Sequence, residues 1–220
     1  MSSPLTGDAA VAWAASAKLQ KVGRRPRLGT YVADAWRRRS FALTLAQFSL
    51  EASTAKSRLG VAWLVIVPAL QITIYGLIFG FILGAARPDN FMPFLITGIV
   101  LFQFLAGSFS DGAKSITSNA SLVRSLNFPR MLLPISAVIS QVFKFVPLML
   151  IMMVTLLFLG EPIRLRWLLM IPILGLALLF SAGTAMIAAR LTVHLSDLNQ
   201  LIPFLTRVAF YASGVFFSVD

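Results

Sequence analysis

Five long stretches with almost no charge determine what this chain can fold into. They are 21 to 30 residues long and are interrupted only by Lys144 and Arg207: residues 59–86, 90–110, 131–160, 167–189 and 198–219. A helix needs roughly 20 apolar residues to cross the hydrocarbon core of a bilayer. We therefore predict an all-α membrane protein whose transmembrane domain covers residues 59–220. Its five predicted spans lie at about 61–84, 91–110, 131–159, 167–189 and 198–219.

Composition excludes the soluble and disordered classes. Hydrophobic residues make up 58% of the 220 residues and charged residues only 12%, whereas a soluble domain carries about 25% charged residues. A mean hydropathy of +0.84 is too high for a disordered chain. The absence of cysteine from the sequence excludes a disulfide scaffold and a thiolate metal site.

The basic residues predict the orientation in the membrane. Ten of the nineteen lie in the first 60 positions, against three acids. With a cytoplasmic N-terminus, fourteen basic residues fall inside and three outside, as the positive-inside rule requires. We therefore predict a multi-pass membrane protein with its N-terminus in the cytoplasm, and no nucleic-acid partner. An odd number of spans ending at Asp220 leads us to expect a longer natural polypeptide.

Two segments precede the first span. Residues 1–30 are small, polar and basic, which predicts a flexible tail. Residues 31–58 contain no Pro or Gly, so a helix is expected there. Val32 and Trp36 fall on one apolar face of this helix and Phe41 on the opposite one. Two faces favour an amphipathic interface helix that meets lipid on one side and protein on the other. An ordinary membrane-surface helix is the alternative.

Small residues at four-residue spacing predict close packing of two spans. The first span carries Gly76, Gly80 and Gly84, and the fourth carries a stripe that consists of Ala177, Ser181, Ala185 and Ala189. Such stripes let helix backbones approach closely in lipid. We interpret them as packing residues, in a tight bundle or at the seam of a homodimer.

Aromatic side chains gather in the second and fifth spans. Phe91, Phe102 and Phe109 lie within about 20° of one another on a helical projection. Sugar rings stack on such rigid faces, so the pattern favours a substrate pathway for a polymer, with lipid-facing phenylalanines as the alternative. The predicted pathway residues are Phe91, Phe94, Phe102, Gln103, Phe109, Phe210 and Tyr211.

Polar side chains inside the predicted spans carry a large free-energy cost of insertion into the membrane. They are Gln71, Gln103, Gln141, Lys144 and Arg207. A charge at the centre of a bilayer costs about 2.5–3.5 kcal/mol on insertion scales. We expect Lys144 and Arg207 to face a wet cavity or a partner. A shifted helix boundary or a side chain that snorkels to the interface is the alternative.

The sequence contains no pattern for catalysis. His194 is the single histidine, and no His or acid pair has metal-ligand spacing. No G-x-x-x-x-G-K-[ST] motif is present, so the chain cannot hold ATP through a P-loop. We expect a transporter subunit and not an enzyme, with no cofactor of its own. If ATP drives transport, ATP and Mg²⁺ must be bound by another chain.

The connector at residues 111–130 is long for a link between two spans. Its sequence predicts a short cytoplasmic helix followed by a stop at Pro129, which could present polar residues to a soluble partner. A solvated connector is the alternative. The predicted contact residues are Ser118, Asn119, Ala120, Ser121, Leu122, Val123 and Arg124.

Several of these segments together resemble the ABC-2 permeases of polysaccharide exporters, the Wzm-type class for O-antigen, capsule and teichoic acid. Residues 56–63 read KSRLGVAW and lead to Pro68. Residues 118–130 read SNASLVRSLNFPR, and residues 210–215 read FYASGV. The resemblance covers nearly the whole chain after residue 30. The basic, alanine-rich N-terminus is most similar to members that export lipid-linked galactan.

The resemblance implies a type V exporter-like bundle, of which five of six spans are present. It further implies a homodimer bound to two ATP-binding cassette subunits, with residues 31–58 as the interface helix. Residues 111–130 resemble the coupling segment that docks on the ATPase, and the aromatic faces resemble the sugar pathway of a lipid-linked polysaccharide. An ABC-2 exporter of a drug or lipid is the alternative. A membrane enzyme, such as a polyprenyl-phosphate glycosyltransferase, is a further one.

Overall fold

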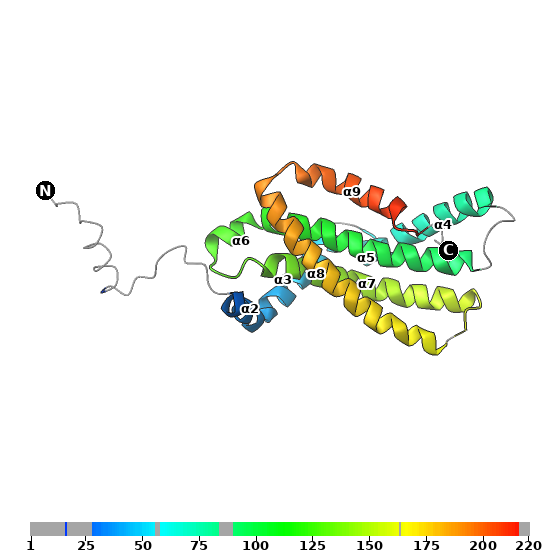
Figure 1. The fold of residues 1–220 in the computed structure, drawn as a ribbon, viewed down its shortest axis with the longest axis horizontal. Coiled ribbons are helices and arrows are strands. Elements are labelled where there is room, and N and C mark those ends of the chain that lie inside the picture. Colours follow the sequence, from blue (N-terminus) through cyan, green and yellow to red (C-terminus); the bar gives the residue numbers. More distant parts are fainter. Residues whose placement is uncertain (1–15, 17–27, 56–57, 84–89, 163, 216–220) are drawn as a thin grey trace.

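The computed structural model describes residue 16 and residues 28–55, 58–83, 90–162 and 164–215, and the regular structure within them is helical (Figure 1). The helices are α2 (Leu28–Arg37), α3 (Arg39–Ala55), η1 (Gly60–Ala62), α4 (Trp63–Leu83), α5 (Phe91–Ser118), α6 (Ala120–Ser125), α7 (Leu132–Phe158), η3 (Leu165–Leu169), α8 (Met170–His194) and α9 (Leu198–Ala212).

Three helical stretches of the described chain are long and apolar enough to cross a membrane. They are α5, α7 and the stretch Trp167–His194, while α4 contains the shorter apolar stretch Trp63–Ile78. Three helix ends differ from the prediction, those of α5, α8 and α9. Helix α8 continues to His194, five residues past the predicted end at position 189. Helix α5 continues eight residues past position 110, because its backbone ladder extends into the polar connector. Helix α9 has 15 residues, and Gly214 follows its C-cap at a φ of 73°, a conformation that ends helices.

Helix α5 is the centre of the bundle and packs along both α7 and α8. The two helices α5 and α8 approach closely at Gly112, where an added Cβ would lie 2.9 Å from the Cα of Ala185. The Thr192 hydroxyl of α8 donates a hydrogen bond to the Ala113 carbonyl of α5. The predicted small-residue stripe of the fourth span is thus buried inside the subunit at Ser181, Ala185 and Ala189.

The glycine stripe of the first span is described in part. An added Cβ at Gly76 of α4 would lie 3.1 Å from the Met92 side chain of α5, so this glycine packs within the subunit. The surroundings of Gly80, and Gly84 itself, lie outside the described residues.

The predicted helix at 31–58 is divided into α2 and α3 by a turn at Arg38. The Arg38 guanidinium pairs with Asp34 at 3.6 Å and donates to the Asn127 carbonyl at 3.0 Å. Helix α3 lies against α7. Its buried positions are Ala42 and Ala46, so small residues, and not the large apolar ones, set the closest contact.

Candidate functional site

Helix α6 protrudes from one end of the bundle. Figure 1 shows it at the same end as α2 and the α8–α9 connection, opposite to the α7–α8 connection. None of its six residues is buried. Only Asn119 separates it from α5, and the Asn119 amide holds this junction by donating to the Ser115 carbonyl at 2.8 Å. The predicted contact segment therefore forms a short exposed helix mounted on the end of the central helix.

Within that segment the side chains divide into two groups. Ser121 and Arg124 are exposed, and Ala120, Leu122 and Val123 are half-buried. Ser118, the last residue of α5, donates its hydroxyl to the Lys114 carbonyl at 2.8 Å. Polar groups surrounding a few partly exposed apolar ones are the composition of a protein contact surface.

An extended elbow at residues 126–131 connects α6 to α7 and holds the N-terminal helices. The Phe128 ring packs against Phe41 of α3, with the ring centroids 5.0 Å apart. The Met131 amide donates to the Tyr31 hydroxyl of α2 at 3.3 Å. A movement of α6 therefore acts on α2 and α3 as well as on α5 and α7.

Lys144 has an intramolecular partner. Its Nζ lies 3.3 Å from Asp111 Oδ2, and the Gln141 amide donates to the same oxygen. The pair links α7 to α5 near the point where α5 leaves its apolar stretch. Lys144 thus faces a charged partner, as expected from the free-energy cost of an unpaired charge in a span. The two residues are 33 positions apart, so no pattern in the sequence indicated that they pair.

We expect this ion pair to contribute measurable coupling. Asp111 is 45% exposed and Lys144 22%, so the coupling energy should be about 1 kcal/mol, near the upper value for surface pairs. Unfolding of Asp111→Asn, Lys144→Met and the double variant in detergent gives this energy from a double-mutant cycle. The exposed Arg164→Met, next to η3, serves as the control and should be neutral. The pairing would be contradicted if the two single substitutions changed the free energy of unfolding by amounts that add up to the change in the double variant.

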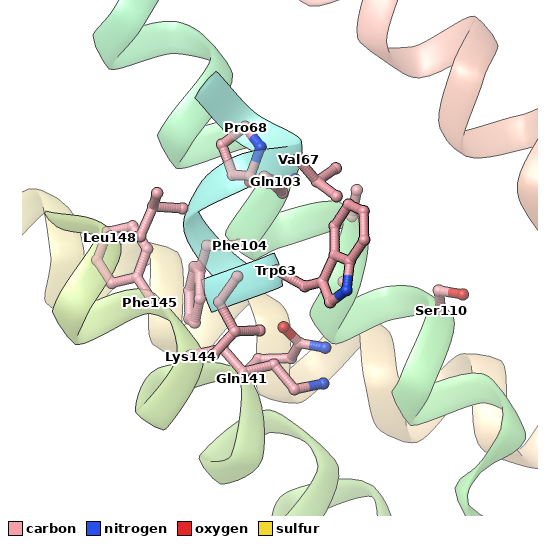
Figure 2. A pocket seen from close by; sticks show the side chains of 13 residues that line it. Trp63, Val67, Pro68, Gln103, Phe104, Ser110, Gln141, Lys144, Phe145 and Leu148 are labelled. Carbon is pink, nitrogen blue, oxygen red and sulfur yellow. The ribbon is translucent and has the colours of Figure 1, made fainter. Parts of the chain in front are cut away.

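Two cavities border this network, and a third adjoins one of them. The α3 cavity, about 580 Å³, lies between α3, α5 and α7 and includes Lys114 and Lys144 in its wall. The α4 cavity, about 430 Å³, lies between α4, α5 and α7. Figure 2 shows Gln141 and Lys144 next to one another in its wall, near Trp63 of α4. Lys144 belongs to both walls, so the ion pair lies where the two cavities meet.

The α9 cavity is the third, about 340 Å³ in volume, between α4, α5 and α9. It shares Gln103, Ala106 and Ser110 of α5 with the α4 cavity. Its aromatic wall is made by Phe102 and Phe210, whose ring centroids are 5.0 Å apart, and by Tyr75, 5.4 Å from Phe210. The cavities therefore follow one another along polar residues of α5.

The α9 cavity brings together three of the predicted pathway residues, Phe102, Gln103 and Phe210. Gln71 and Arg207, which interrupt the apolar stretches, line it too. Sequence reasoning missed Tyr75, because only the aromatic residues of the second and fifth spans were compared and Tyr75 lies in the first. Tyr75 lies four residues from Gln71, one helical turn away, which was a usable signal.

The remaining predicted pathway residues are placed differently. Phe91 is buried against Leu95 and Ile99 and contributes to packing. Phe109 packs on the cluster of α5, α8 and α9 residues around Ala188. Phe94 is exposed, and Tyr211 is exposed with its ring centroid 5.7 Å from that of Phe210.

Comparison with known proteins places the fold in a family. A family model described as ABC-2 type transporter matches residues 42–220. This chain belongs to that family. The predicted family and the all-α membrane fold class are thereby confirmed, and the membrane-enzyme alternative loses its support because the ABC-2 family is one of transporters.

Three curated relatives add detail. Two O-antigen export system permease proteins RfbA of Klebsiella pneumoniae are each 28% identical, over 74% and 73% of this chain and 63% and 62% of their own length. The RfbA permease of Myxococcus xanthus is 26% identical over 86% of this chain and 72% of its own length. The chain thus spans a little under two thirds of the Klebsiella relatives.

Proposed function

We propose that this chain is the membrane permease subunit of an ATP-driven exporter of lipid-linked polysaccharide in the bacterial cytoplasmic membrane. The names of the ABC-2 relatives support this class of cargo. Two copies would enclose the pathway, and two separate ATP-binding cassette subunits would bind ATP and Mg²⁺. The positive-inside distribution supports a cytoplasmic N-terminus. An O-antigen-like glycan, with galactan as one candidate, is the proposed cargo.

The observation that carries the proposal is the form of α6. It exposes a polar surface, buries none of its residues and joins the central helix through one residue. A soluble subunit that closes on ATP would move α6, and α5 would follow because the Asn119 junction is hydrogen-bonded to Ser115. The same movement would reach α2 and α3 through the elbow.

The α9 cavity supports the choice of cargo. Three rings offer faces for sugar stacking, and the amides of Gln71 and Gln103 offer hydrogen bonds to hydroxyl groups. Stacking and neutral hydrogen bonds are individually weak in water-filled sites. A polymer can therefore move through such a site without being trapped in it.

Charge reversal on α6 tests the proposed coupling. We expect Arg124→Glu to lower ATPase activity of the reconstituted transporter by about tenfold, because an interface charge would meet a like charge. Arg164→Glu is the matched control, since Arg164 is also exposed but lies next to η3 at the α7–α8 connection. ATPase activity in proteoliposomes with the partner subunit measures both. Wild-type activity and assembly of Arg124→Glu would contradict the docking role of α6.

Depletion of the protein in cells tests the cargo. Export of lipid-linked glycan predicts that this glycan accumulates on the cytoplasmic side when the protein is removed. The measurement is extraction and mass spectrometry of the lipid-linked fraction. A normal glycan level would instead favour export of a drug or another lipid.

A further inference from the structure

Arg207 is a charged residue that the ion pairs described above leave out. It lies nine residues after the start of α9, about 14 Å along the helix axis. No carboxylate of the described residues lies within ion-pair distance of it. Arg207 is exposed in the described chain, so its guanidinium is open to a ligand that enters the cavity it lines. Arg207 lines the α9 cavity.

The groups around Arg207 are hydrogen-bonding amides. Gln103 Nε2 lies 3.5 Å from Gln71 Oε1, which joins α5 to α4 across the cavity wall. Gln103 Oε1 is buried and has no hydrogen-bond partner within the described chain. A buried acceptor without a partner carries a desolvation cost that a ligand hydroxyl would remove. The two amides thus provide a place for a polyhydroxylated ligand.

Aromatic rings complete the wall. Phe102, Phe210 and Tyr75 present ring faces on the same cavity as the guanidinium and the amides. A guanidinium binds phosphate or carboxylate with two parallel hydrogen bonds. Rings, amides and one guanidinium in about 340 Å³ match a ligand that is both a sugar and an anion, in a volume typical of small-molecule sites.

We infer that the α9 cavity is a binding site for an anionic group carried on a sugar, with Arg207 as the residue that holds the anion. The anion is a phosphate or a carboxylate, as in a sugar phosphate of a lipid linker or in an acidic sugar of the chain. This inference deepens the proposed function and rests on it. It assigns to the cavity a preference for charged over neutral sugars.

The test is binding to the purified permease in lipid nanodiscs. The probes are glucose 1-phosphate, glucuronic acid and the neutral methyl glucoside, titrated by saturation-transfer NMR. We expect wild-type protein to bind both anions more tightly than methyl glucoside. Arg207→Gln should weaken binding of the anions by about tenfold or more, the loss of one charge-assisted contact, and leave methyl glucoside unchanged.

Two further variants keep the result interpretable. Arg207→Lys retains the charge but loses the two parallel hydrogen bonds of the guanidinium, so its affinity for the anions should lie between those of wild type and Arg207→Gln. Arg164→Gln removes an exposed arginine away from the cavity and should behave as wild type. Tighter binding of glucose 1-phosphate would identify the phosphate source, and tighter binding of glucuronic acid the acidic sugar.

Three results would overturn the inference. They are equal affinity for charged and neutral probes, anion binding that survives Arg207→Gln, and no binding of any probe. Failure of the proposed function is distinguished by the depletion experiment. Arg207-dependent anion binding together with a normal level of lipid-linked glycan would retain the site and reject polysaccharide export.

Discussion

Gly112→Leu is expected to destabilise the subunit by about 3 kcal/mol or more, at the upper end of overpacking effects. A Cβ at this position already lies 2.9 Å from the Cα of Ala185 and overlaps its Cβ. Backbone atoms cannot move aside as a side chain can, so α5 and α8 would have to separate. For a chain of this size the midpoint of thermal unfolding should fall by about 6–12 °C, measured in detergent by size exclusion after heating.

The chain offers a matched control on the opposing helix. Gly183 lies two residues before Ala185, and a Cβ added there meets no heavy atom within 4 Å. Gly183→Leu should therefore change stability by no more than about 0.5 kcal/mol. Equal unfolding midpoints for Gly112→Leu and the wild type would show that the two helices are not in contact at this point.

Phe128→Ala should release the N-terminal helices from the elbow. The ring is half-buried against Phe41 and the cluster of Ala35, Ala42 and Leu132, so its removal should cost about 2 kcal/mol, below the value for a fully buried ring. If α2 and α3 open as a local unit, their amide hydrogens should exchange about thirtyfold faster, since 1.4 kcal/mol corresponds to a factor of ten. Hydrogen exchange followed by mass spectrometry measures this directly.

Phe158→Ala is the control for that experiment. Phe158 ends α7 and is 86% exposed, so its loss removes a ring without removing protein contacts. Exchange in α2 and α3 should stay at the wild-type rate. Unchanged exchange in Phe128→Ala as well would mean that the packing of α3 on α7 and the Arg38 and Tyr31 contacts hold these helices without the ring.

The apolar stretches of the sequence correctly predicted the first residues of three helices. The predicted starts at positions 91, 131 and 198 lie within one residue of α5, α7 and α9, because hydropathy changes sharply there. The end of α5 was missed, since residues 111–118 are polar and hydropathy does not report a helix that continues into water. The turn at Arg38 was also missed, because it depends on the contact with the Asn127 carbonyl, 89 positions away.

The candidate site was predictable as a set of residue types but not as an arrangement. Gln71, Gln103 and Arg207 stood out in the sequence because polar side chains inside a span raise the free-energy cost of membrane insertion. That all three line one cavity depends on how α4, α5 and α9 pack. The partner of Lys144 likewise depends on the pairing of α5 with α7, which no periodicity within one helix can reveal.

The length of α5 has a mechanical consequence. Its 28 residues form one uninterrupted helix of about 42 Å, longer than the roughly 30 Å of a bilayer's hydrocarbon core. No proline follows Pro93 within it, but Gly107 and Ser108 form a Gly–Ser pair in its interior, and such pairs are sites where helices kink. A displacement applied at Ser118 is therefore expected to move residues 108–118 as one rod and to bend α5 at this pair before it reaches Phe91.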